Sequence, residues 1–322
     1  MNFSKFNITV VIPSYRTESE ILSVLKGLPA FVRHIIVVDD ASPDASASVV
    51  LAAAKKDKRI TLVRHEKNQG VGGAMITGFK TALTLGTDIV IKLDGDGQMD
   101  TQYIPALLEP LVLGEADYAK GNRFRDFQAL QQMPLVRRVG NLGLSFLTKA
   151  ATGYWNLFDP TNGYFAIRAD VLEKLPFDKI DKRYFFETSM LAQLYLLDAC
   201  VQDVTMPARY GAERSHLSIR RAMFEFPFKL TRTFLRRIIL KYFIYDFSMM
   251  SIYLLTGIPL LLFGLIFGIT KWIQYYNIGI SAPTGTVILP TLSVILAIQI
   301  LLSAIEIDLN ATPRKAISKA LV

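Results

Sequence analysis

Two aspartates and a glutamine alternate with glycines in residues 94–98, and these three side chains carry oxygen atoms that could bind a metal ion. The preceding residues 88–93 are mostly apolar and β-branched, which predicts a buried strand. In an extended segment alternate side chains point the same way, so Asp94, Asp96 and Gln98 would face one side together. Hard oxygen donors suit Mg²⁺ or Mn²⁺, which leave coordination sites open for substrate phosphates. Taken alone, the same pattern also fits a solvated Asp/Gly turn.

The elements that would position these side chains alternate between strands and helices. Apolar runs predict strands at residues 8–12, 35–38, 60–63 and 89–93, and helical segments lie between them. This βαβ pattern predicts an α/β domain with a mostly parallel sheet. Right-handed crossovers bring the carboxyl ends of the strands to one edge, which is where the ligand crevice of such folds lies.

Further polar residues follow the other predicted strands. Pro13, Ser14 and Tyr15 come after the first strand, and Asp39 and Asp40 come after the second. These residues would share the edge that also holds the acid pair of residues 94–98. Their common location favours one ligand site over several unrelated solvated turns.

Three glycines, Gly70, Gly72 and Gly73, precede a helix predicted at residues 75–85. A dinucleotide fingerprint would need G-x-G-x-x-G directly after the first strand, and the phosphate-binding pattern G-x-x-x-x-G-K-[ST] does not occur. The glycines therefore favour close packing of the helix on the sheet, or a backbone wall beside a nucleotide.

The composition indicates a soluble domain joined to a membrane part. The chain has 322 residues, 51% of them hydrophobic, a mean hydropathy of +0.30 and a net charge of +8. A single cysteine, Cys200, excludes a disulfide within the chain and a cysteine-based metal site. His34, His65 and His216 lack metal-ligand spacing. The first residues lack the pattern of a signal peptide, so we expect a cytoplasmic soluble domain over residues 1–214.

The last third of the chain has the pattern of a membrane attachment. Residues 215–246 are basic and aromatic, and Pro227 would divide them into two short amphipathic helices at the membrane surface. Charge-free runs then predict a transmembrane hairpin within residues 247–306, with spans at about 248–270 and 287–305. Basic residues crowd before the first span and follow the second, whereas the linking loop has only Lys271, which predicts that both termini, including the tail 307–322, are cytoplasmic. The adjacent spans argue against nucleic acid as the partner of the basic segment.

Four segments in order resemble the family 2 glycosyltransferases of GT-A fold, and more narrowly the polyprenyl-phosphate glycosyltransferases, which include dolichol-phosphate mannosyltransferase and bactoprenol glucosyltransferases. The residues that carry the resemblance are Val11–Tyr15, Val37–Asp44, Asn68–Ala74 and Leu93–Gln98. The segment Asp159–Arg168 resembles a family segment that lines the sugar and acceptor side, where Asp159, Thr161 and Asn162 would suit sugar hydroxyls, although Asp-Pro and Asn-Gly are equally common turn formers. Glu187 matches the position of a family acid, and its alternative is a first-turn partner of the helix dipole. Glu18 stands one or two places from where relatives have a glutamate.

The resemblance implies roles for particular residues. The nucleotide-sugar would be bound by Pro13, Tyr15, Glu18, Asp39, Asp40, Gly70, Gly72, Asp94, Asp96 and Arg123. The divalent cation would be held by Asp94, Asp96 and Gln98. The acceptor phosphate would be bound by Arg209, Arg214 and Arg138, and the catalytic residues would be Asp96, Arg123 and Arg209.

The implied activity is inverting transfer of a hexose from a nucleotide-sugar, with UDP-glucose as the expected type, to a polyprenyl phosphate at the cytoplasmic face of the inner or plasma membrane. A homo-oligomer is compatible with this prediction. GDP-mannose is the alternative donor. A processive polysaccharide synthase of the same fold is disfavoured, because its Gln-x-x-Arg-Trp motif and additional spans are absent from the sequence. A non-catalytic membrane adaptor would not need the intact acid pair.

Overall fold

The computed structural model describes residues 1–122, 135–160, 162–206 and 219–321. The chain divides into two compact units. The larger unit consists of residues 1–234 together with 313–322, and the smaller unit consists of residues 235–312.

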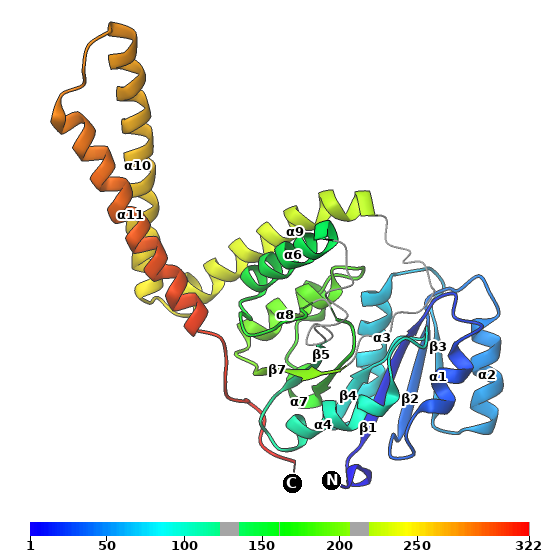
Figure 1. Cartoon of the computed structure of the whole chain (residues 1–322). Coiled ribbons are helices and arrows are strands. Elements are labelled where there is room, and N and C mark those ends of the chain that lie inside the picture. The colour runs from blue at the N-terminus through cyan, green and yellow to red at the C-terminus, as the bar shows by residue number, and fades with distance from the viewer. Residues whose placement is uncertain (123–134, 161, 207–218, 322) are drawn as a thin grey trace. The chain divides into compact units, whose positions relative to one another are not determined.

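The larger unit is built on a mixed sheet of seven strands in the order β3-β2-β1-β4-β6-β5-β7 among the described residues (Figure 1). Strands β1 (Ile8–Ser14), β2 (His34–Asp39), β3 (Ile60–Arg64) and β4 (Ile89–Lys92) are parallel. Strand β6 (Phe165–Arg168) runs antiparallel to β4 and to β5 (Tyr118–Asn122), and β7 (Val201–Thr205) is parallel to β5. The predicted fold class, a mostly parallel sheet, is confirmed.

Helices cover both faces of this sheet because its strands are apolar on both sides. One core joins the sheet to α1 (Ile21–Gly27), α2 (Ser46–Lys56) and α4 (Ile104–Val112). The other core joins the opposite face to α3 (Val71–Thr84) and α8 (Phe186–Leu196). The remaining elements of this unit are η1 (Phe3–Lys5), η2 (Thr101–Tyr103), α6 (Leu135–Thr152), α7 (Ala169–Leu172) and η3 (Phe177–Lys179).

The strand order creates a crevice at the carboxyl ends of β1 and β4. From β1 the chain moves outward to β2 and β3, whereas β4 lies on the other side of β1. Crossovers leaving in opposite directions open a crevice between two strands, which is the usual ligand position in such sheets. The loops after β1, β2 and β4, which carry the predicted site residues, all start at this edge.

The predicted break at Pro227 is wrong. A single helix, α9 (Ile219–Ile239), contains Pro227 in its interior and is followed by the π-helical segment η4 (Leu240–Tyr245). A proline removes one hydrogen bond and bends a helix, but it need not end one when helix-forming residues continue on both sides. Leu230 and Ile238 are both buried, but in separate clusters: Leu230 packs with Ala151 and Phe185, and Ile238 packs with Tyr242 and Met250.

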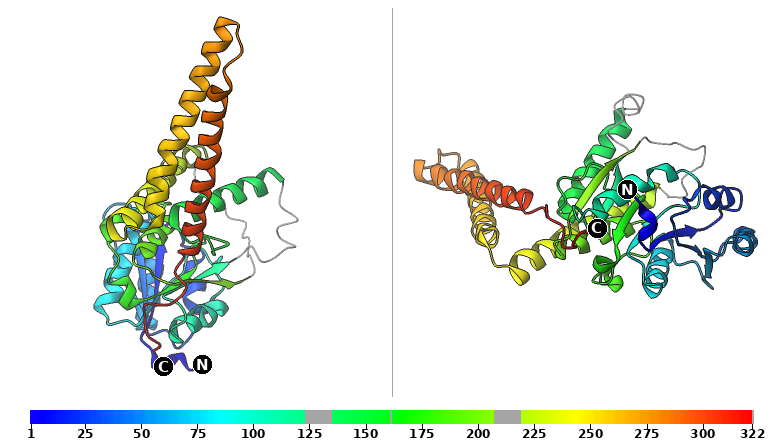
Figure 2. Two further views of the ribbon diagram at one scale, coloured as in Figure 1. Left: turned by 90° about the vertical axis from the view of Figure 1, so that its left-hand side faces the viewer. Right: turned by 90° about the horizontal axis from the view of Figure 1, so that it is seen from below.

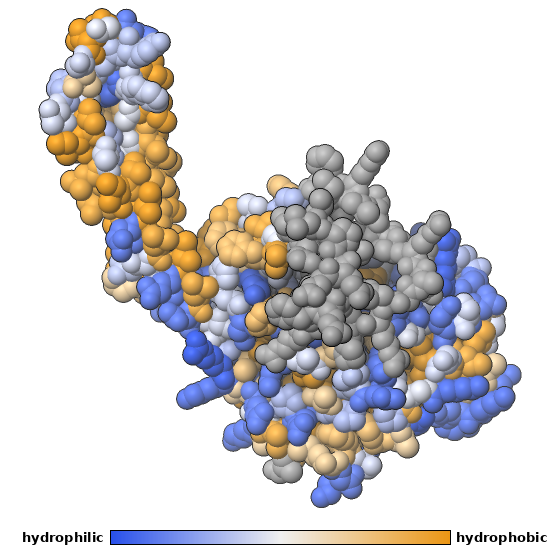
Figure 3. Space-filling model, in the orientation of Figure 1, coloured by the Kyte–Doolittle hydropathy of each residue, from blue (hydrophilic) through white to orange (hydrophobic). Residues whose placement is uncertain are grey.

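The smaller unit contains two long antiparallel helices, α10 (Met249–Ile278) and α11 (Thr284–Asn310), which lie side by side (Figure 2). Small residues permit their close approach: a Cβ at Gly264 would lie 3.0 Å from the carbonyl oxygen of Pro290. Their outward surface is mostly hydrophobic (Figure 3). Both helices are long and apolar enough to cross a membrane, with a hydropathy of 2.3 each, and both extend beyond the predicted spans.

The end of the chain returns to the larger unit. The carboxylate of Asp117, which is fully buried, accepts hydrogen bonds from the amides of Ile317 at 3.0 Å, Ser318 at 2.9 Å and Cys200 at 2.7 Å. The amide of Leu321 donates to the carbonyl of Val112 at 2.9 Å. The tail predicted to begin at residue 307 is therefore helical to Asn310, and its last residues are part of the larger unit.

Replacing Asp117 with alanine should release this terminal segment. The change leaves buried amides without an acceptor, at a cost of about 3 kcal/mol in the free energy of unfolding. Limited proteolysis followed by mass spectrometry should show faster cleavage after residue 312, together with a lower midpoint of thermal unfolding. Asp170→Ala is the control, because Asp170 contacts only the Ser318 side chain in this segment, at 2.9 Å. Unchanged cleavage in Asp117→Ala would contradict the assignment.

Candidate functional site

The acid pair lies in the loop that leaves β4. The Oδ1 atom of Asp94 lies 2.7 Å from the Nζ atom of Lys92, and 31% of the Asp94 side chain is exposed. Asp96 accepts a hydrogen bond through Oδ1 from the backbone amide of Gln98 at 3.0 Å. Gln98 itself is exposed. The two carboxylates therefore stand at the crevice, with the Gln98 side chain at its surface.

Glycines give this loop its shape. Gly95 is buried, and a Cβ at this position would lie 3.2 Å from Thr17 Cγ2 and 3.4 Å from Ile21 Cδ1, so the loop packs tightly on the chain that follows β1. Gly97 has a φ of 74°, in the left-handed region that other residues rarely adopt. Tight packing at Gly95 and the backbone conformation at Gly97 thus both favour glycine.

The electrostatics of the acid pair fit a divalent cation. Burial raises the pKa of Asp96, and the neighbouring charge of Asp94 raises it further, while Lys92 opposes the shift. Among the described residues, no group of three or more His, Cys, Asp or Glu side chains could hold a metal ion. Two carboxylates that leave the other positions to water and phosphate are a normal set for Mg²⁺. The residues present therefore fit the predicted cation.

A buried lysine connects three separate segments behind the acid pair. The Nζ atom of Lys92 is 2.7 Å from Asp94 Oδ1 and 3.6 Å from Oε1 of Glu187, in the first turn of α8. A Cβ at Gly163 would fall against this ammonium group and would lie 3.3 Å from Glu187 Oε1 and 3.4 Å from Asp94 Oδ2. The structure thus brings together the acid pair, the segment at 159–168 and Glu187. The sequence analysis missed Lys92, whose signal was a lone lysine in an apolar strand.

The segment at 159–168 is largely internal. Asn162 is buried, and its side chain donates to the carbonyl of Gly121 at 2.8 Å and accepts from the amide of Tyr164 at 3.0 Å. Its carbonyl accepts from Nζ of Lys120, a buried lysine whose pKa is lowered to about 8 by desolvation. The Asn162 side chain therefore shapes a turn, as one of the two predicted alternatives had it. Thr161 lies outside the described residues.

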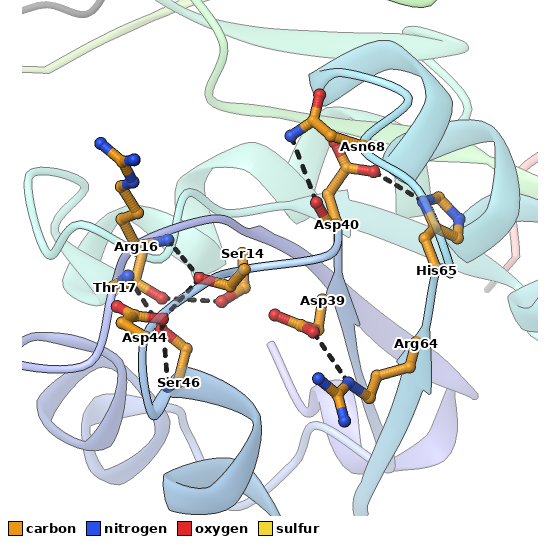
Figure 4. A network of polar contacts seen from close by, with 11 residues as sticks. Ser14, Arg16, Thr17, Asp39, Asp40, Asp44, Ser46, Arg64, His65 and Asn68 are labelled. Carbon is orange, nitrogen blue, oxygen red and sulfur yellow. Dashed lines mark hydrogen bonds and ion pairs between the residues drawn. The ribbon is translucent and has the colours of Figure 1, made fainter.

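The carboxylate of Asp40 binds the glycine-containing loop that precedes α3, and Figure 4 shows its neighbours His65 and Asn68. Its carboxylate accepts from the amides of Gln69 at 2.8 Å and Gly70 at 2.7 Å, and its Oδ1 lies 2.7 Å from Nδ1 of His65. The side chain of Asn68 donates to the Asp40 carbonyl at 3.2 Å. An acid that accepts amides at the start of α3 also interacts favourably with the helix dipole. Asp40 thus fixes the loop before α3.

Asp39, one residue earlier, has an unused acceptor. Its Oδ2 accepts from Nε of Arg64 at 3.1 Å, and the Arg64 side chain is 62% exposed (Figure 4). Its Oδ1 is buried and has no hydrogen-bond partner among the residues that the structure describes. Buried acceptors normally have a partner, so this oxygen is a candidate to receive an N–H group of a ligand.

The loop after β1 contains both exposed residues and residues that are held by hydrogen bonds. Tyr15 is 41% exposed, with the guanidinium of Arg16 over its ring at 5.4 Å. Pro13 is half-buried in β1. Glu18 accepts from the amide of Ala45 at 3.1 Å, and so links this loop to the start of α2. Tyr15 and Pro13 are therefore at least partly accessible at the end of β1, while the Glu18 carboxylate connects two loops.

Gly70 and Gly72 pack against the segment that precedes α8. A Cβ on Gly70 would lie 2.6 Å from the carbonyl oxygen of Lys182, and one on Gly72 would lie 2.9 Å from Phe186 Cβ. The amide of Gly73 donates to the carbonyl of Lys182 at 2.9 Å. These glycines are therefore closely packed, but against residues 181–186 and not, as one of the two alternatives had predicted, against the sheet.

The predicted arginines are not placed by the structure. Arg123, Arg209 and Arg214 lie outside the described residues, as does the side chain of Arg138, whose backbone belongs to α6. Their predicted roles with the donor and the acceptor phosphate stay predictions.

Comparisons with known proteins point to one family. A family model described as glycosyl transferase family 2 matches residues 9–176. The chain is 34% identical over 190 residues to a UDP-N-acetylglucosamine–dolichyl-phosphate N-acetylglucosaminyltransferase of Methanococcus voltae, covering 55% of this chain and 75% of the relative. It is 31% identical over 186 residues to an undecaprenyl-phosphate mannosyltransferase of Micrococcus luteus, covering 57% and 75%.

Among solved structures, a glucosyl-3-phosphoglycerate synthase from Mycobacterium tuberculosis, in complex with Mn²⁺, UDP-glucose and phosphoglyceric acid, aligns with a TM-score of 0.53 at 22% identity. The alignment covers 72% of this chain and 79% of that chain. The likeness confirms the predicted GT-A fold.

Proposed function

Because the chain belongs to glycosyl transferase family 2, we propose that it transfers a hexose from a nucleotide-sugar to a polyprenyl phosphate at a membrane surface. The observation that carries the proposal is the pair Asp94 and Asp96 at the crevice between β1 and β4, with Lys92 holding one of the two. The relatives named above act on dolichyl or undecaprenyl phosphates, which supports this class of acceptor.

In this proposal Asp94 and Asp96, with Gln98 beside them, hold Mg²⁺ or Mn²⁺, which stabilises the negative charge that develops on the departing nucleoside diphosphate. Asp39 receives an N–H of the base through its unpartnered oxygen. Asp40 acts indirectly by fixing residues 68–70.

The acceptor needs little activation, because a lipid phosphate is already an anion at neutral pH. Its oxygen attacks the anomeric carbon opposite the leaving diphosphate, which inverts the configuration. Most of the acceleration would then come from holding the two reactants in line. We assign the phosphate to Arg209, with Arg214 and Arg138 as further candidates, and assign Arg123 to the donor.

Helix α9 supports the membrane location. Its exposed apolar residues Phe228, Leu235 and Ile239 lie among the exposed bases Arg232 and Arg236. A helix of this composition lies at the surface of an anionic membrane, where lipid phosphates are found. Together with the apolar hairpin, it would keep the enzyme at the membrane, with the larger unit on the cytoplasmic side.

A uridine-linked donor is the donor class that we favour. The relative from Methanococcus voltae is named for UDP-N-acetylglucosamine, and the structural neighbour was crystallised with UDP-glucose. GDP-mannose is the alternative, since other relatives are mannosyltransferases.

The test uses membranes from cells that express the chain, incubated with Mn²⁺, polyprenyl phosphate and one labelled donor at a time: UDP-glucose, UDP-N-acetylglucosamine or GDP-mannose. Label should move from a uridine donor into the organic phase, and EDTA should prevent the transfer. Label from GDP-mannose alone would overturn the donor class. Label only in water-soluble products would overturn the acceptor.

Replacing Asp39 with asparagine should weaken UDP binding by about tenfold or more, because a hydrogen bond to a charged acceptor contributes about 1.5–3 kcal/mol. Isothermal titration of the purified full-length protein with UDP and Mn²⁺ measures the change. Arg64→Gln is the matched control, because it removes the ion pair at 3.1 Å and keeps the Asp39 carboxylate. A loss of the same size in both variants would show that the ion pair, and not the free oxygen, supports binding.

A further inference from the structure

Lys92 is a charged residue in an apolar environment. Only 1% of its side chain is exposed. Across the sheet it is paired with Val11 of β1 and Phe165 of β6, so it points to the face that packs on α3 and α8. Lysine is rarely buried without compensation, because removing its charge from water is costly. Its position therefore needs an explanation beyond the packing of the sheet.

The compensation comes from two acids on different elements. Asp94 approaches the ammonium group to 2.7 Å from the loop after β4, and Glu187 approaches to 3.6 Å from α8. Both carboxylates therefore lie within ion-pair distance of the buried ammonium group. The absent side chain of Gly163 provides the space for the ammonium group.

We propose that Lys92 is a positioning residue of the donor site. It binds Oδ1 of Asp94 and so fixes that side chain, which leaves Oδ2 for the metal ion on the donor. Glu187 in turn holds the ammonium group of Lys92 in place. This inference rests on the proposed function, because it assigns Asp94 to the donor. It adds a residue that the motif of alternating acids and glycines does not contain.

The charges support this role. One ammonium group and the carboxylates of Asp94, Asp96 and Glu187 leave a net formal charge of two negative units, which a single divalent cation balances. Without Lys92 the same site would carry three negative units in a partly buried position. A partner that orients a metal-binding side chain typically affects metal affinity by about 10- to 100-fold when it is removed.

A merely structural role for Lys92 would make a different prediction. Removing one member of a buried ion pair destabilises a protein, whereas removing both members often restores stability. A double substitution, Lys92→Met with Glu187→Gln, should therefore recover the fold. It should not recover the position of Asp94, which has lost its only contact with an ammonium group in this cluster.

The experiment measures two quantities on the full-length protein in detergent: the dissociation constant of UDP in the presence of Mn²⁺, by calorimetry, and the midpoint of thermal unfolding. Lys92→Met should raise the dissociation constant by at least about tenfold and lower the midpoint. The double variant should regain the midpoint and keep the raised dissociation constant. Lys120→Met is the matched control, because Lys120 is also buried opposite Phe165 but binds a backbone carbonyl; it should lower only the midpoint.

Three outcomes would overturn the inference. They are an unchanged dissociation constant in Lys92→Met, recovery of tight binding in the double variant, and an equal loss of binding in Lys120→Met. These results would leave the proposed function standing, because the unsubstituted protein would still bind UDP with Mn²⁺. Absence of binding by the unsubstituted protein, to UDP and to GDP alike, would overturn the proposed function and this inference together.

Discussion

Replacing Asp96 with alanine should reduce sugar transfer to polyprenyl phosphate by about a hundredfold to a thousandfold, while the protein stays folded and membrane-bound. Asp96 stands beside Asp94 at the crevice, and burial together with the charge of Asp94 raises its pKa. A cation shared between the two carboxylates would stabilise the ionised form of Asp96 against both its burial and the charge of Asp94. Groups that stabilise charge developing in a transition state commonly contribute a hundredfold to a thousandfold each.

The measurement is the initial rate of label transfer into lipid at saturating Mn²⁺, with equal amounts of protein in the membrane fraction. Asp178→Ala is the control, since that acid is 68% exposed and paired with Lys179 on the surface. The control should transfer sugar at the unsubstituted rate. Activity within tenfold of normal in Asp96→Ala would remove Asp96 from the site.

The second large effect concerns stability and lies in the smaller unit. Arg237 and Asp308 form a buried bidentate ion pair, with distances of 2.6 Å and 2.9 Å between guanidinium nitrogens and carboxylate oxygens. The hydroxyl of Tyr242 donates to Asp308 at 2.7 Å. Arg237→Met should lower the free energy of unfolding by about 3–5 kcal/mol, because it leaves a buried carboxylate without its cation.

Thermal unfolding of the detergent-purified protein measures this loss. The double variant Arg237→Met with Asp308→Leu should recover most of it, because no unpaired charge is then left in the interior. An unchanged midpoint in Arg237→Met alone would contradict the account. So would a double variant that is less stable than either single variant.

The sheet could be predicted from the sequence because its strands are local patterns. Apolar β-branched runs end at Asp39 and before Asp94, and the structure places those strands within a residue or two of the prediction. The positions of the acids followed from strand order alone, since parallel strands end at one edge. Helix α3 begins earlier than predicted, at Val71, and Gly72 in its first turn packs against the segment before α8.

Contacts between distant residues could not be predicted in this way. Asp117 binds amides about 200 positions later in the chain, and no local pattern marks that partnership. Asp40 has the same residue type as Asp39, yet its carboxylate is taken by the loop at residues 68–70. In the sequence, Lys92 is indistinguishable from an ordinary polar residue at the end of a strand. Its burial beside Glu187 becomes visible only when α8 is placed against the sheet.

The most direct test of the central claim is a doubly labelled donor. UDP-glucose and UDP-N-acetylglucosamine would each carry one isotope in the sugar and another in the β-phosphate, and would be incubated with polyprenyl phosphate, Mn²⁺ and the purified protein. The account predicts that the sugar label of one donor enters the lipid while the phosphate label stays in UDP, because the acceptor keeps its own phosphate. Both labels in the lipid would identify a sugar-phosphate transfer and contradict the account, and so would neither label in the lipid from any donor.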